Sequence, residues 1–177
     1  ITKMLPADLY RDEGFKTICT NPCAEIPLSS YDSCRLISIN LKHMVLESFT
    51  ENAKFDFDKL KEVAAAAMRL SDDLVELEIE KLENILNVSD TNDEKEMWSK
   101  LLIACKNGRR TGLGTHGLAD VLARLRLPYH DEEAIDITEK IYRTLKESSY
   151  EESIHLAQER GPFPVYNSSY EVDHPYL

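Results

Sequence analysis

The sequence has few of the features that mark a membrane, secreted or nucleic-acid-binding protein. Its 177 residues contain no apolar run of the ~18 residues that a membrane-spanning helix needs, and no secretory signal peptide. Basic residues number 21 against 32 acidic ones, and the formal net charge of −11 disfavours a broad surface for nucleic acid or anionic membrane. We therefore expect neither partner, and we expect a cytoplasmic location (the host cytoplasm if the source is a virus).

Glycine and proline are also scarce, with 6 and 7 residues, and the sequence shows no internal repeat. The apolar share of 42% is enough for a hydrophobic core in a chain of this size. The first residue is not Met and the last ones form no helix cap, so we expect both ends to be cuts in a longer polypeptide. The composition indicates one globular domain or a large part of one.

Cysteine is rare, yet three of the four cysteines lie between residues 19 and 34. In a reducing compartment, clustered thiols are more often redox-active or metal-binding than paired in structural disulfides. In the stretch NPCAEIPLSSYDSC, an extended backbone would point Asn21, Cys23 and Glu25 to one side. A carboxylate accepts a proton, an amide binds a hydroxyl, and a thiol gives up a hydrogen atom or a proton. Cys34 follows at a distance that allows the chain to fold back beside Cys23.

Two other interpretations of these thiols remain open at this point. Cysteine is among the most buried residue types, so the same spacing equally allows small buried side chains on two strands. A metal site made by Cys19, Cys23 and Cys34 would lack the closely paired cysteines of a zinc module. We therefore expect no metal site here.

Hydrophobic periodicity predicts short strands near the N-terminus and long helices after it. Asp56 or Asp58 is expected to cap the first helix. The expected strands cover 15–20 and 35–41, and the expected helices cover 60–86, 94–108, 118–127 and 134–157.

A glycine-rich stretch, TGLGTHG, precedes the third expected helix and is interpreted as a turn. Such a turn can offer backbone N–H groups to a phosphate. A dinucleotide-binding fingerprint also needs a strand before it, and a helix and its cap are expected instead. The glycines fit a close approach of two backbones better. Gly112, Gly114 and His116 stay as weak candidates for contact with substrate or cofactor, although capping or packing is the commoner role of a histidine.

Three further features receive structural interpretations. The acidic residues between 72 and 83 are expected on a solvated helix face rather than in a metal site. Trp98 is expected in a core or an interface. Cys105 lies in an expected helix and is interpreted as a small buried hydrophobe.

The segments NPCAEIPL and SCRLISINL resemble the active-site segment of ribonucleotide reductase large subunits, most closely the adenosylcobalamin-dependent class II branch. NGRRTGLGTHGLADVLARL and LAQERGPFP resemble two further segments of that family in the same order. The helical stretch that starts at FDFDKL resembles the connection between them in its class II form. The resemblance spans nearly all of residues 15–165.

This resemblance implies an α/β fold: a ten-stranded barrel with a finger loop through its centre, of which this chain is a mostly helical part. All of 1–177 would belong to the catalytic barrel domain. Within it, 1–53 would hold the finger and flanking strands, 54–107 the helical connection, and 108–177 the glycine-rich turn and further helices.

The resemblance also implies a role for each residue of the cysteine stretch. Cys23 resembles the residue that becomes a thiyl radical and takes the 3′ hydrogen of the ribose. Glu25 resembles the base that acts on the 3′ hydroxyl, and Asn21 the residue that hydrogen-bonds the ribose hydroxyls. Cys34 resembles one half of the thiol pair that supplies electrons and ends as a disulfide.

The implied activity is that of a ribonucleoside-diphosphate reductase with adenosylcobalamin as cofactor. The partners implied are a ribonucleotide substrate, the remaining segments of the reductase and a thioredoxin-like reductant. The chain lacks the cysteine that would pair with Cys34 and the loop that holds the substrate phosphates, so this piece alone is expected to be incomplete and to bind no cofactor. A class I large subunit, with a separate radical-generating subunit, is the first alternative. An inactive assembly module is the second, supported by Arg35 and Ile37, which stand where the family usually has Asn and Gly.

Overall fold

The computed structural model of the chain describes residues 8–24 and 26–173. These residues fall into two compact units. The first takes the described residues of Ile1–Arg35, Asp72–Gly112 and Gly161–Leu177, and the second takes Leu36–Ser71 and Leu113–Arg160.

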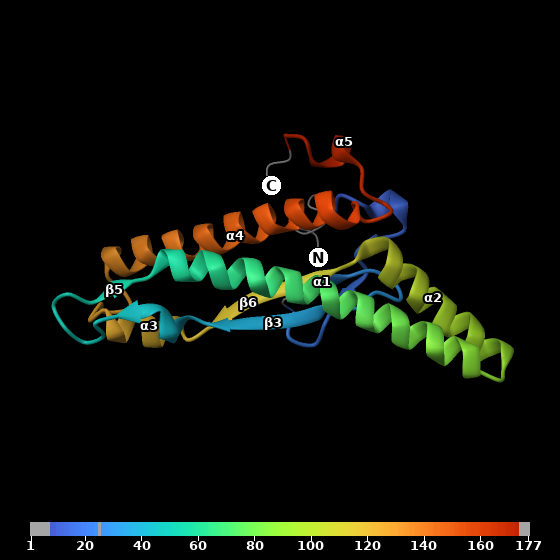
Figure 1. Cartoon of the computed structure of the whole chain (residues 1–177), viewed down its shortest axis with the longest axis horizontal. Coiled ribbons are helices and arrows are strands. Elements are labelled where there is room, and N and C mark those ends of the chain that lie inside the picture. The colour runs from blue at the N-terminus through green and yellow to red at the C-terminus, as the bar shows by residue number, and fades with distance from the viewer. Residues whose placement is uncertain (1–7, 25, 174–177) are drawn as a thin grey trace. The chain divides into compact units, whose positions relative to one another are not determined.

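Long helices run through both units (Figure 1). The helices are α1 Phe57–Val88, α2 Asn92–Gly108, α3 Leu118–Arg124, α4 Glu132–Arg160 and α5 Ser168–Glu171, with short 3₁₀ turns η2 Arg11–Glu13 and η3 Leu41–Met44. The strands are β1 Cys19–Thr20, β2 Pro27–Leu28, β3 Arg35–Asn40, β4 Val45–Leu46, β5 Lys54–Phe55 and β6 Thr111–His116.

The described residues form three two-stranded sheets, β1–β2, β3–β6 and β4–β5, and no closed barrel. The first and third pairs are antiparallel. In Figure 1 the arrowheads of β3 and β6 point the same way, as in a parallel pair. The chain between these two strands contains α1 and α2, which fits the long crossover that parallel strands need. The predicted strand at 35–41 is confirmed as β3, whereas only Cys19–Thr20 of the expected strand at 15–20 is β-strand.

Helix α1 begins at the predicted cap. The Asp56 carboxylate accepts the backbone N–H of Lys59 at 2.9 Å, which satisfies one of the unpaired donors of the first turn. Helix α2 begins with a capping box that we did not predict: the Thr91 hydroxyl accepts the N–H of Glu94, whose carboxylate accepts the N–H of Thr91. It ends at Gly108, where the expected helix also ends, and Arg109 after it takes the left-handed conformation with φ +42°.

The core of the second unit lies between the N-terminal half of α1, helix α4 and the segment from β3 to β5. Leu41, Leu60, Val121 and Ile141 are fully or almost fully enclosed there. Ile37 packs against this core from β3, so its side chain is accommodated there. Leu70 has the helical spacing of the other apolar residues of α1, yet it is 53% exposed.

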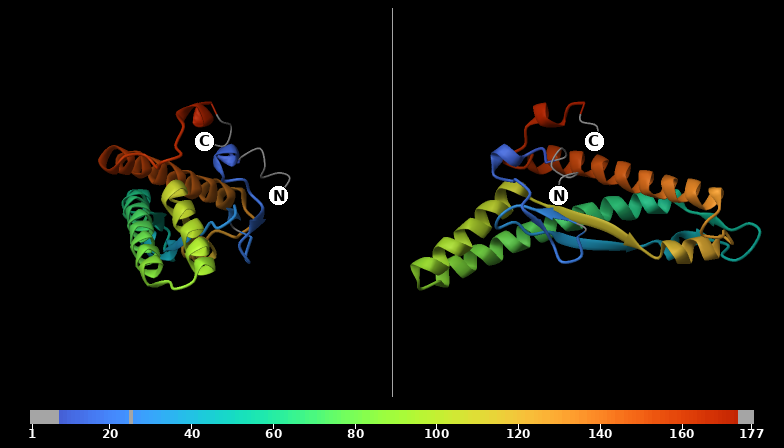
Figure 2. Two further views of the ribbon diagram at one scale, coloured as in Figure 1. Left: turned by 90° about the vertical axis from the view of Figure 1, so that its right-hand side faces the viewer. Right: turned by 180° about the vertical axis from the view of Figure 1, so that it is seen from behind.

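The first unit has a smaller core where the C-terminal half of α1 runs beside α2 (Figure 2). Val75, Ile79, Leu82 and Cys105 are buried together, and Trp98 packs against them. The predictions for Trp98 and Cys105 as core residues are confirmed.

The glycine-rich stretch is a strand and not a turn, which corrects our interpretation of 111–116. Gly112 and Gly114 lie within β6, and a Cβ added at Gly114 would meet no atom within 4 Å. Only Gly117, just before α3, has a positive φ of +83°. A phosphate-binding turn at Gly112 and Gly114 is therefore excluded, and Gly114 does not serve a close approach of two backbones.

No helix in the part of the chain that the structure describes is long and apolar enough to cross a membrane.

Candidate active site: the cysteine hairpin and the segment after it

The cysteine stretch forms a small antiparallel hairpin in the first unit. Strand β1 pairs with β2, with Cys19 opposite Leu28 and Thr20 opposite Pro27. Asn21 closes the loop between them, because its backbone N–H donates to the Ile26 carbonyl at 3.2 Å and its side-chain oxygen accepts the Ile26 N–H at 3.0 Å. The Asn21 side chain thus has a structural task in the hairpin as well as its predicted role.

Cys23 lies at the tip of this hairpin and is exposed. Pro22 and Cys23 form a turn, and Ala24 has a positive φ of +63°. The backbone here is therefore not extended. The argument that an extended chain points Asn21 and Cys23 to the same side does not apply to it. Glu25 lies outside the described residues.

The segment after the hairpin, residues 29–35, leads to Cys34. Ser29 is buried, and its hydroxyl donates to Asp32 at 3.2 Å. The same Asp32 carboxylate accepts the backbone N–H of Ser33 and pairs with the Arg110 guanidinium at 2.5 Å. Cys34 itself is half-buried. We call residues 29–35 the Cys34 segment.

Arg35 closes this segment and is buried, with 7% of its surface exposed. Its guanidinium pairs with Glu78 of α1 at 2.7 Å and donates to the Cys105 sulfur of α2 at 2.7 Å. It also donates to the carbonyl oxygens of Ser33 and Arg110. The Cys34 segment is therefore tied to both helices of the first unit.

The thiols differ in their surroundings. Burial raises the pKa of the Cys105 thiol, and the neighbouring Arg35 guanidinium partly opposes that rise by favouring the thiolate. Cys19 and Cys23 are exposed. All four cysteines lie in the described part of the chain, and none of them forms a disulfide.

The acidic residues of α1 are not simply a solvated face, which corrects our expectation. Arg109 forms ion pairs with Asp72 and Glu76, and Asp72 is buried with 9% exposed surface. Lys106 pairs with Glu83 at 2.5 Å. The basic residues at the end of α2 thus neutralise several of the carboxylates. Among the described residues, no group of three or more His, Cys, Asp or Glu is placed to hold a metal ion.

His116 lies at the end of β6 and is exposed. Its Nδ1 is 2.8 Å from the Ser38 hydroxyl of β3, so it bonds across the strand pair. This contact gives His116 a structural partner and does not bring it together with Gly112 or Gly114 around a ligand.

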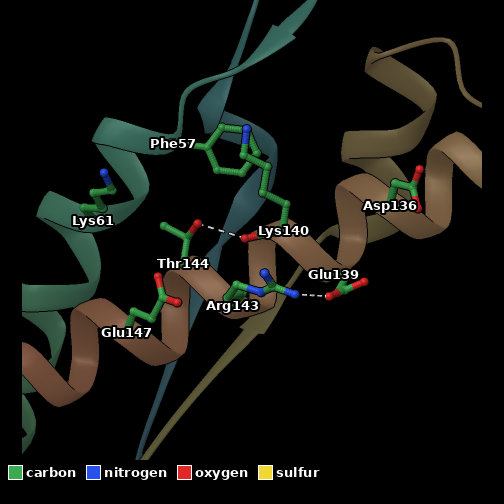
Figure 3. A pocket seen from close by; sticks show the side chains of 8 residues that line it. All are labelled: Phe57, Lys61, Asp136, Glu139, Lys140, Arg143, Thr144 and Glu147. Carbon is green, nitrogen blue, oxygen red and sulfur yellow. Dashed lines mark hydrogen bonds and ion pairs between the residues drawn. The ribbon is translucent and has the colours of Figure 1, made fainter.

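An open groove of about 580 Å³ lies in the second unit, between the start of α1 and α4 (Figure 3). Three cations and three carboxylates line it, so its charge is balanced. Lys140 stacks over the Phe57 ring, with 4.3 Å between Nζ and the ring centroid, and Arg143 pairs with Glu139. None of the residues predicted for the site lines this groove.

Sequence reasoning missed the residues that hold the Cys34 segment, namely Asp32, Glu78 and Arg110. One signal was available. Arg35 stands in a strand of branched apolar residues, and a charge in such a place needs a partner elsewhere in the chain.

The family described as ribonucleotide reductase, barrel domain, matches residues 11–174. The chain belongs to this family. Among the curated ribonucleotide reductases that it resembles, the vitamin B12-dependent ribonucleoside-diphosphate reductase of Thermoplasma acidophilum is 37% identical over 155 residues, 87% of this chain and 18% of that protein. The protein of the same name from Mycobacterium tuberculosis (strain CDC 1551 / Oshkosh) is 35% identical over 150 residues, 85% of this chain and 19% of that protein.

A ribonucleoside-diphosphate reductase large subunit from vaccinia virus (strain Copenhagen) is 30% identical over 174 residues, 93% of this chain and 20% of that protein. The chain thus spans about a fifth of the length of the curated reductases that it matches. A solved structure of the Actinobacillus ureae class Id ribonucleotide reductase alpha subunit resembles it with a TM-score of 0.59 and 22% identity, over 89% of this chain and 27% of that one. That likeness supports the fold.

Proposed function

We propose that this chain supplies the radical-bearing hairpin and one reducing thiol of a ribonucleotide reductase that makes deoxyribonucleotides from ribonucleoside diphosphates. The observation that supports this most is the exposed thiol of Cys23 at the tip of the β1–β2 hairpin, in a chain of the reductase barrel family. A buried thiol at that position could not reach a substrate.

The proposed reaction begins with a thiyl radical at Cys23, which takes the 3′ hydrogen atom of the ribose, so an S–H bond forms and a C–H bond breaks. Glu25 accepts the proton of the 3′ hydroxyl, and Asn21 hydrogen-bonds the ribose hydroxyls. The 2′ hydroxyl leaves as water, while Cys34 and a second thiol supply two electrons and two protons and become a disulfide. The Cys23 thiol then returns its hydrogen atom to the 3′ carbon, which restores the thiyl radical, and Glu25 returns its proton to the 3′ oxygen.

The remaining parts of the enzyme would come from outside this chain. The family barrel has ten strands, and we propose that all of 1–177 belongs to it, with the other strands, the phosphate-binding loop and the second thiol on other segments. A thioredoxin-like dithiol would reduce the disulfide after each turnover. Gly112, Gly114 and His116 carry no proposed contact with substrate, since Gly112 and Gly114 lie in a strand and His116 is bonded to Ser38.

Adenosylcobalamin is the proposed radical source, because the vitamin B12-dependent relatives reach 35–37% identity and the viral large subunit 30%. The groove of Figure 3 does not fit a corrinoid, since it is open and lined mostly by charged side chains. We therefore assign no residue of this chain to the cofactor. A class I large subunit is the alternative, and the match to that viral protein is the observation that favours it.

The test is Cys23→Ser in the full-length enzyme that contains this sequence. An oxygen-centred radical substitutes poorly for a thiyl radical, so turnover should disappear while nucleotide binding stays near normal. Cys19→Ser is the matched control, because Cys19 is also exposed and lies on the same hairpin, and it should keep most of the activity. If Cys23→Ser keeps even a tenth of the wild-type rate, a barrier change of about 1.4 kcal/mol, the radical assignment is wrong.

A further inference from the structure

The buried guanidinium of Arg35 is the least expected charge in the first unit. A buried charge is costly unless ion pairs and hydrogen bonds compensate for it. One terminal nitrogen of Arg35 lies 2.7 Å from a Glu78 oxygen and 2.7 Å from the Cys105 sulfur. The other donates to the carbonyl oxygens of Ser33 and Arg110, at 3.3 and 3.2 Å. The planar fork of an arginine suits this many acceptors, whereas a lysine would not reach all of them.

These contacts hold the chain on both sides of Cys34. Arg35 follows Cys34 directly and pairs with one oxygen of Glu78. Ser33 precedes Cys34 directly, and its hydroxyl donates to the other oxygen of Glu78 at 2.9 Å. One carboxylate on α1 therefore binds both sequence neighbours of Cys34. The pair between Asp32 and Arg110 adds a second link to the end of α2.

We infer that Arg35, together with Glu78, is a positioning residue that fixes Cys34 for thiol–disulfide exchange. This inference rests on the redox role proposed for Cys34. Two cysteines form a disulfide only when their Cα atoms come within about 7 Å and their side chains point together. A misplacement of about 1 Å at a reacting group can cost about a hundredfold in rate. The contacts of the Cys34 segment with two long helices supply this precision. Arg35 stands where the family usually has Asn, and holding this segment would be its function.

The first measurement does not depend on activity. In the reduced, resting full-length enzyme, the rate at which iodoacetamide alkylates Cys34 is followed by mass spectrometry. Arg35→Met keeps an unbranched apolar stem and removes the charge and hydrogen bonds of the guanidinium, so the segment should loosen. We expect alkylation of Cys34 to become about tenfold faster or more, the scale on which positioning acts.

Arg109→Met is the matched control. Arg109 also links α2 to α1, but its ion pairs are with Asp72 and Glu76 and not with the Cys34 segment. It should leave Cys34 alkylation within about twofold of wild type. Equal effects of the two substitutions would mean that both act by loosening the helix pair, and would overturn the inference.

The second measurement separates positioning from general damage. Pre-reduced enzyme can complete one turnover without an external reductant, while continuous turnover needs the disulfide of Cys34 to be reduced again. Arg35→Met should lower the dithiol-driven continuous rate at least tenfold more than Arg109→Met does, and Arg35→Lys should recover part of it because the charge remains. A radical step at Cys23, detected as a single product turnover, should persist at a reduced level.

Glu78→Gln keeps the inference testable if Arg35→Met does not fold. Glu78 is about one-third exposed, so its amide is tolerated more easily. Faster alkylation of Cys34 in this variant supports the inference, and an unchanged rate overturns it. Failure of the proposed function looks different: Cys34 of the wild-type enzyme would stay alkylatable after a turnover, whatever Arg35→Met does to the resting enzyme.

Discussion

Gly108 is the glycine whose missing side chain matters most for packing. It ends α2 in the first unit, directly beneath the ring of Phe15. A Cβ built on Gly108 would lie 2.5 Å from the nearest ring carbon of Phe15, and that ring is itself buried. This neighbour is a side chain, so the contact is not the approach of two backbones that we expected at 112–117. In that stretch a Cβ on Gly117 would lie 3.6 Å from the backbone nitrogen of Lys42.

We predict that Gly108→Ala destabilises the full-length protein by about 1–3 kcal/mol, the usual cost of overpacking. The buried Phe15 ring cannot move aside without disturbing its neighbours, and this outweighs the gain in helix propensity. The measurement is the urea dependence of unfolding. Gly114→Ala is the control and should be nearly neutral, since its new methyl group meets nothing within 4 Å. Equal stabilities of the two variants would show that the Phe15 contact is loose.

Helix α1 changes its buried face along its length. In the second unit it buries Leu60, Ala64 and Ala67, and in the first it buries Val75 and Ile79. Leu70 falls between these two stretches and is exposed. A single 3.6-residue stripe does not describe such a helix, because each half packs against different elements.

At this scale we predict that Leu60→Ala lowers the free energy of unfolding by about 2–5 kcal/mol, since Leu60 is fully buried and its loss leaves a cavity. Leu70→Ala on the same helix should cost much less, because the side chain is already half in solvent. Chemical denaturation of the full-length protein measures both. A loss for Leu70→Ala as large as that for Leu60→Ala would mean that another part of the full-length protein covers this face.

At the scale of the whole molecule, this chain corresponds to about a fifth of the length of its curated relatives. What this part contributes is one cysteine at the tip of a hairpin and a second cysteine on a segment fixed to two helices. A radical source, a phosphate site and the second reducing thiol are proposed for the remaining segments. The radical source distinguishes the proposed class II reductase from the class I alternative.

We predict that the full-length protein forms deoxyribonucleotides when adenosylcobalamin and a dithiol are added, without a second protein subunit. The cofactor would supply the radical that class I enzymes obtain from a separate subunit. Chromatographic detection of the deoxyribonucleotide is the measurement, and hydroxocobalamin, which lacks the deoxyadenosyl group, is the control. Activity that appears only with a separate metal-containing subunit would place the protein with the class I reductases.

The sequence by itself determined the helices, the strand at β3 and the concentration of thiols near the N-terminus. Helical hydrogen bonds join residues that are four apart in the sequence. Amphipathic periodicity and caps such as Asp56 also involve only neighbouring residues, so the sequence alone reveals them. The resemblance to the reductase family also lies in short segments, since the order of residues around Cys23 and Cys34 carries it. The roles of Asn21, Cys23, Glu25 and Cys34 stay predictions.

Only the tertiary structure decided the strand pairs and the buried ion pairs, because these join residues that are far apart in the chain. The stretch of β6 reads as a glycine-rich turn, and its pairing with β3 makes it a strand. In the sequence, Arg35 is notable only because the family usually has Asn at this position. The fold shows that its guanidinium contacts Glu78, Cys105 and Arg110. Strand pairing and buried ion pairs join groups that are tens of residues apart, so no local pattern reveals them. Packing of the chain against itself therefore decided how Cys34 is held.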